Sequence, residues 1–124
     1  MQKLLMVGLG GFLGSVMRYW IGGLVMDRAG TTFPWGTFAI NISGSFMMGI
    51  LFAVALERFA VGEGTRIFLA IGFLGAYTTF STLMLESYTM LEAGKFLLAG
   101  VDIAASVVMG FFAFYLGLVL GRLV

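Results

Sequence analysis

The chain has 124 residues, of which 60% are hydrophobic and 10% are charged, and its net charge is +1. A soluble domain usually has about a quarter of its residues charged, so this composition indicates lipid as the surrounding solvent. The small net charge excludes a basic surface for nucleic acid. Cysteine and histidine are absent, which excludes disulfides, zinc sites built on these residues and imidazole catalysis. With no nucleophile–base pair or cofactor motif either, an enzyme is not expected.

Four apolar segments predict an all-α integral membrane protein that forms a single domain over residues 1–124. Clusters of charged and turn-forming residues separate the spans, which we expect at 4–26, 34–56, 67–91 and 96–123. Each span is long enough to cross a hydrocarbon core of about 30 Å. Four spans place both termini on one side of the membrane, here named side A, and the first and third loops on the other, side B.

The basic residues near the span ends favour one orientation only weakly. Those expected on side A are Lys3, Arg58, Arg66 and Arg122, and those expected on side B are Arg28 and Lys95. Such a small positive-inside bias allows insertion in both orientations. Insertion in both orientations would permit an antiparallel homodimer, which composition alone does not establish.

Small and polar residues recur every fourth position in three of the spans and so line one helix face. The rows are Gly10, Gly14, Arg18 and Gly22; Thr37, Asn41, Ser45 and Gly49; and Asp102, Ser106 and Gly110, followed by Ala113, Gly117 and Gly121. In lipid, rows of small residues permit close approach of helix backbones. Helix packing therefore explains most of these glycines.

Polar side chains inside the spans need a further explanation, because an ionisable group in lipid is costly unless it is paired or faces water. The four are Arg18, Asn41, Glu86 and Asp102. Counted along each helix from side B at about 1.5 Å per residue, they lie at similar depth. This predicts a shared water-filled vestibule on side B. The alternative is that Arg18 and Asp102 neutralise each other as a buried structural pair, whereas Asn41 has no obvious partner.

The third span is predicted to be broken. Residues 72–82 read Gly-Phe-Leu-Gly-Ala-Tyr-Thr-Thr-Phe-Ser-Thr, and the hydroxyls that follow the two glycines compete for backbone hydrogen bonds. A break at membrane depth is tolerated inside protein or beside a cavity, and it frees carbonyls that can coordinate a small cation. A kinked but intact helix is the alternative.

Three stretches of the chain resemble the Fluc (CrcB) fluoride channel family. They are Gly-Gly-Phe-Leu-Gly-Ser-Val-Met-Arg-Tyr at 10–19, Trp-Gly-Thr-Phe-Ala-Ile-Asn at 35–41, and the third-span motif at 72–82. The resemblance extends over essentially the whole chain. It implies an antiparallel, dual-topology homodimer with two pores, in the plasma (inner) membrane of a prokaryote. Such a channel passively exports fluoride, lowers cytoplasmic fluoride and confers fluoride resistance.

The resemblance also implies roles for individual residues. The residues of the implied fluoride pathway are Arg18, Asn41, Phe80, Ser81, Thr82, Leu83 and Glu86. The implied cofactor is a structural sodium ion at the dimer interface, held by the backbone carbonyls of Gly75 and Thr78. Amide and hydroxyl groups supply the donors that replace the hydration of fluoride. The positive edge of an aromatic ring suits an anion as well.

Two positions depart from the expected pattern. Leu83 stands where the family usually has phenylalanine, so a second ring edge is missing, which leaves open a partner chain of different sequence. Asp102 places a negative charge near the vestibule, and the resemblance assigns it no role.

Two other functions fit the size of the chain. A proton-coupled small multidrug transporter needs an acid in its first span, but that span has Arg18 and no acid before Asp27. A non-transporting assembly or anchoring protein would need the small-residue rows alone, and it leaves Asn41 and Phe80 unexplained. The sequence therefore favours an anion pathway.

Overall fold

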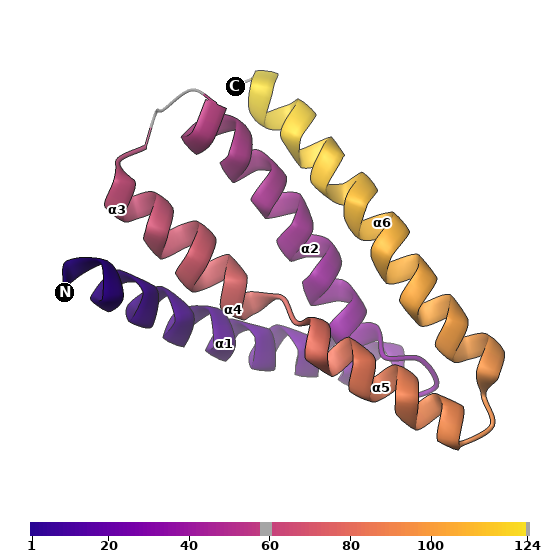
Figure 1. The fold of residues 1–124 in the computed structure, drawn as a ribbon. Helices are drawn as coiled ribbons and strands as arrows, with labels where there is room; N and C mark the ends of the chain where they lie inside the picture. Colours follow the sequence, from indigo (N-terminus) through magenta and orange to yellow (C-terminus); the bar gives the residue numbers. More distant parts are fainter. Residues whose placement is uncertain (58–60, 124) are drawn as a thin grey trace.

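The computed structural model describes residues 1–57 and 61–123, and within them four helices are long and apolar enough to cross a membrane. They cover Gln2–Ala29, Trp35–Ala55, Glu63–Glu92 and Phe96–Leu123. This confirms the predicted all-α membrane architecture. The first helix begins, and the last helix ends, at the same end of the bundle (Figure 1), as an even number of spans requires. Arg58, which we counted on side A, lies outside the described residues.

The first and fourth spans are single helices, α1 (Gln2–Ala29) and α6 (Phe96–Leu123). The second span is α2 (Trp35–Leu51) followed by a π-helical segment, η1 (Phe52–Glu57). The third span is built from four pieces: α3 (Glu63–Arg66), π-helical η2 (Ile67–Leu74), α4 (Gly75–Tyr77) and α5 (Phe80–Glu92).

The third span is interrupted between α4 and α5 (Figure 1). Thr78 has φ −84° and ψ 157°, and Thr79 has φ −149° and ψ 120°. Both residues are therefore extended, in the β region of backbone space. The predicted break is confirmed. The alternative of a kinked but intact helix is wrong, because two consecutive extended residues cannot continue an α-helix.

Glycines set the closest helix contacts, as the small-residue rows predict. α2 lies along α6, and α1 lies along η2 and α4. A Cβ added at Gly117 would overlap the carbonyl oxygen of Phe46, and a Cβ added at Gly14 would overlap that of Phe73. Only a residue without a side chain allows the backbones to approach this closely.

Ion pairs join the spans near the side-A surface. Lys3 in α1 pairs with Glu63 in α3, and Arg122 in α6 pairs with Glu57 in η1. These pairs connect the first span to the third and the fourth span to the second. Their side chains are partly or largely exposed, so each contributes little to stability.

Candidate functional site

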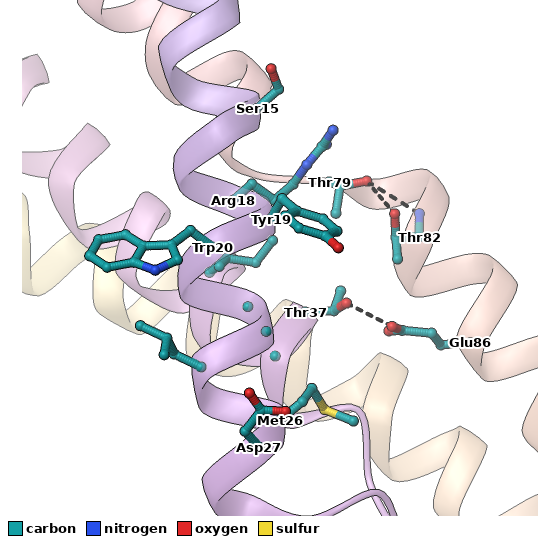
Figure 2. Close-up of a pocket in the computed structure, with 15 residues that line it drawn as sticks. Ser15, Arg18, Tyr19, Trp20, Met26, Asp27, Thr37, Thr79, Thr82 and Glu86 are labelled. Atoms are coloured by element: carbon teal, nitrogen blue, oxygen red, sulfur yellow. Dashed lines mark hydrogen bonds between the residues drawn. The ribbon is translucent and has the colours of Figure 1, made fainter.

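Two cavities meet at the break in the third span. The first cavity, of about 620 Å³, lies between α1, α2 and α5, and Figure 2 shows its lining. The second cavity, of about 220 Å³, lies between α2, α5 and α6. Thr79 lines both cavities. The break therefore forms part of the wall between two hollows in the protein.

Asn41 holds the break in place. Its Nδ2 donates a hydrogen bond to the carbonyl oxygen of Thr79 at 3.0 Å, and the amide of Thr79 donates to its Oδ1 at 2.7 Å. One side chain thus pairs with both polar groups of an extended residue inside the membrane span. The expectation that Asn41 has no obvious partner was wrong, because its partner is main chain rather than side chain. A second Nδ2 hydrogen remains for the second cavity, which Asn41 also lines.

Hydroxyl groups cluster where α5 begins. Thr79 Oγ1 accepts a hydrogen bond from the amide of Thr82 at 3.2 Å and so caps the helix. It also donates to Thr82 Oγ1 at 3.0 Å and lies 3.3 Å from Ser81 Oγ. Unpaired amides and the helix dipole favour an anion at a helix N-terminus. The structure therefore brings Ser81 and Thr82 to an end of a helix that suits negative charge.

The break also frees two main-chain carbonyls, those of Gly75 and Thr78. In a continuous helix they would accept from the amides of Thr79 and Thr82, four residues further on. Those two amides donate instead to the side chains of Asn41 and Thr79. Gly75 is exposed at the surface of the single chain. These are the two carbonyls that the family resemblance assigns to a cation.

Arg18 and Glu86 both line the first cavity, and Figure 2 shows their side chains extending in different directions. Glu86 Oε1 accepts a hydrogen bond from Thr37 Oγ1 at 2.8 Å, while its Oε2 is buried without a partner in the described part of the chain. Within the described residues, 1–57 and 61–123, no ion pair joins Arg18 to Glu86. The first cavity is thus lined by one cation, Arg18, and by two acids, Glu86 and Asp27.

Asp102 lines neither cavity. It is completely buried, and its Oδ2 accepts a hydrogen bond from Ser87 Oγ at 3.1 Å. The alternative in which Arg18 and Asp102 form a buried pair was wrong, because no such ion pair exists within the described residues. Of the four polar residues predicted at one depth, Arg18 and Glu86 line the first cavity and Asn41 lines the second. Asp102 lies behind them.

Phe80 and Leu83 are neighbours on the second cavity but differ in exposure. The Phe80 side chain is 70% exposed in the single chain, whereas Leu83 is 3% exposed. Leu83 therefore presents methyl groups to the cavity from a tightly packed position, and Phe80 presents its ring at the surface of the subunit.

The polar residues of the site that were not among the predicted pathway residues include Thr37, Thr79 and Ser106, which line the cavities, and Ser87, which bonds to Asp102. Thr37 and Ser106 stand in the same four-residue rows as Asn41 and Asp102, which was a usable signal. The contact of Ser87 with Asp102 crosses between helices, and no local pattern indicates it.

The family model described as CrcB-like protein, Camphor Resistance (CrcB), matches residues 5–118. The chain belongs to the CrcB family. This confirms the resemblance on which the residue roles were based.

Named CrcB relatives are similar over nearly their full length. One from Solidesulfovibrio magneticus, named fluoride-specific ion channel FluC, is 40% identical over 124 residues, which cover 100% of this chain and 99% of that one. One of the same name from Magnetococcus marinus is 43% identical over 118 residues (95% and 96%). Another from Rhizobium meliloti is 42% identical over 122 residues (98% and 98%). These relatives are bacterial channels, and the chain is accordingly a multi-pass prokaryotic membrane protein rather than an enzyme.

Proposed function

We propose that this chain forms a fluoride-selective channel that lets fluoride leave the cell passively. The observation that carries the proposal is the set of donors beside the break: the free amide hydrogen of Asn41 and the hydroxyls of Ser81 and Thr82 at the N-terminus of α5. Fluoride is small and strongly hydrated, so a pore must offer such donors in place of water. The relatives that bear the name of a fluoride-specific channel support the same function.

The multidrug-transporter alternative is not favoured. The first span faces the first cavity with Arg18, and no acid precedes Asp27 in it. A cation at this position suits an anion rather than a cationic drug.

The proposed assembly is an antiparallel homodimer with two pores. Two observations support it: the ring of Phe80 is largely exposed on a single chain, and the freed carbonyl of Gly75 belongs to an exposed residue of the same span. A second copy that crosses the first at the break would cover both the Phe80 ring and the Gly75 carbonyl. Lipid in its place would leave that carbonyl without a hydrogen-bond partner. The buried Leu83 cannot supply a second ring, so a partner chain with phenylalanine there is the alternative assembly.

A structural sodium ion at the centre of this dimer is also part of the proposal. The carbonyls of Gly75 and Thr78 have lost their helical donors, and carbonyl oxygens suit a small hard cation. Bound there, the ion would neutralise partial negative charge at the break. Purification with potassium in place of sodium should reduce the fraction of dimer seen on size exclusion. An unchanged dimer under sodium-free conditions would contradict the sodium site.

Fluoride efflux from liposomes tests the function. Purified protein is reconstituted with internal potassium fluoride or potassium chloride, and efflux is followed with an ion-selective electrode after valinomycin is added. We expect fast fluoride efflux and no chloride efflux above that of protein-free liposomes. Equal efflux of both ions, or efflux of neither from a folded dimer, would contradict a fluoride-selective homomeric channel.

A further inference from the structure

Asp102 is a completely buried acid without a balancing cation in the described part of the chain. Its Oδ2 accepts from Ser87, but its Oδ1 has no hydrogen-bond partner among the described residues. Ser106 Oγ, one turn further along α6, is also buried and interacts with the Asp102 carboxyl, although the two groups are not aligned as a regular hydrogen bond. Buried polar atoms are seldom left unpaired. Asp102 is therefore surrounded by two serine hydroxyls, those of Ser87 and Ser106, and by no cation among the described residues.

This place adjoins the second cavity. Ser106 lines the cavity together with Asn41 and Phe80. Leu83 lines it from α5, and Ser87, the partner of Asp102, follows one turn later on the same helix. Asp102 itself lies about 6 Å along α6 from Ser106, on the side-B side. The Ser87–Asp102 pair therefore lies one helical turn beyond the cavity lining, toward side B.

Among residues 1–57 and 61–123, the charged and titratable groups around Asp102 do not include a nearby cation. α2 contains no titratable side chain. On α5, Glu86 interacts electrostatically with Asp102, and the exposed Tyr88 and Glu92 bond to each other. Glu57 in η1 pairs with Arg122 at the opposite, side-A end of α6, and Tyr115 lies toward that end as well. Lys95 is exposed in the loop before α6.

We propose that Asp102 sets the rate of fluoride conduction through its protonation state. The proposal rests on the function proposed above. An ionised carboxylate behind the second cavity repels an anion held between Asn41 and Ser106. Once Asp102 binds a proton, the repulsion disappears and a carboxyl O–H becomes an additional donor. Conduction by this chain therefore increases as pH falls.

The expected effect is large enough to measure. A unit charge about 6 to 8 Å away, in a medium with an effective dielectric constant of about 20, changes the occupancy of an anion site by at least about tenfold. Asp102→Asn removes the charge, keeps an oxygen to accept from Ser87, and adds a donor. We expect Asp102→Asn to conduct at least about tenfold faster than the wild type near neutral pH.

The test measures fluoride efflux at a series of pH values, with the same pH inside and outside the liposomes. The series runs from about pH 5.5 to about pH 8.5, which is above the range in which an ordinary carboxyl titrates in water. Protein-free liposomes at each pH give the leak of hydrogen fluoride to be subtracted. Wild-type efflux should increase toward low pH. Asp102→Asn should be fast and independent of pH, and Glu86→Gln should keep the pH dependence.

Several outcomes would overturn the proposal. Wild-type efflux that is independent of pH does so without any variant, so the test does not depend on Asp102→Asn folding. Loss of the pH dependence in Glu86→Gln while Asp102→Asn retains it would assign the effect to Glu86. Efflux that is present but independent of pH leaves the channel function intact, whereas no efflux from any variant at any pH contradicts both proposals.

Discussion

The half of the bundle near the termini and the half near the first and third loops are stabilised in different ways. Toward side A, backbones meet at glycines, and an apolar cavity of about 370 Å³ lies between η2 and the end of α2. Toward side B, cavities are lined by hydroxyl, amide and charged groups, and a carboxyl is buried. The first half thus combines close backbone packing with ion pairs at its surface. In the second half, within the described residues, polar groups left without a regular hydrogen bond include Glu86 Oε2 and Ser106 Oγ, whose residues line the two cavities.

The largest effect on folding is expected in the side-A half. Gly117→Ala would force α6 away from the Phe46 carbonyl, and overpacking of this kind costs about 1–3 kcal/mol. We expect little monodisperse protein after detergent extraction. Gly100→Ala on the same helix is the control, because a Cβ there has no atom within 4 Å. Equal yield and melting temperature for the two variants would contradict the close contact.

Asn41→Ala should have the largest effect on conduction in the side-B half. It removes a donor from the second cavity and leaves the Thr79 amide and carbonyl unpaired, at a cost of about 1–3 kcal/mol. We expect fluoride efflux to fall at least tenfold, while chemical cross-linking still detects the dimer. Thr89→Ala is a control, because the Thr89 hydroxyl bonds back to Leu85 within α5. Wild-type efflux in Asn41→Ala would show that this side chain only stabilises the break.

Phe80→Ile should have a smaller and more selective effect. The ring is mostly exposed on the single chain, so its loss changes little of the packing within a subunit. We expect a several-fold lower fluoride efflux at an unchanged melting temperature, because an aliphatic side chain has no positive edge. Phe12→Ile, at a similarly exposed position on α1, is the matched control. If both variants conduct like the wild type, the ring edge plays no part.

Much of the fold could be predicted from local sequence features. Apolar length gives the four spans, and the rows that contain Gly14 and Gly117 identify faces that pack closely. The hydroxyl-rich stretch after Gly75 predicts the break, because those side chains compete with helical hydrogen bonds. Each of these signals lies within one helix and needs no knowledge of its neighbours.

The site was only partly predictable, because its geometry depends on contacts between helices. Depth along a helix placed Asp102 level with Arg18 but gave no information about rotation, and the structure turns Asp102 toward Ser87 instead. The same limit applies to Asn41, whose partner is the main chain of Thr79. A side chain that binds backbone leaves no complementary residue type in the sequence.

The bond between Asn41 and Thr79 has a consequence for the order in which the protein is made. The extended residues of the third span have polar main-chain groups that the surrounding lipid cannot satisfy. Because α2 precedes the third span in the chain, ribosomes synthesise Asn41 first. The side chain that accommodates the break is therefore already in the membrane when the break arrives. A circular permutant that made the third span before α2 would lose this advantage during biogenesis while encoding the same final contacts.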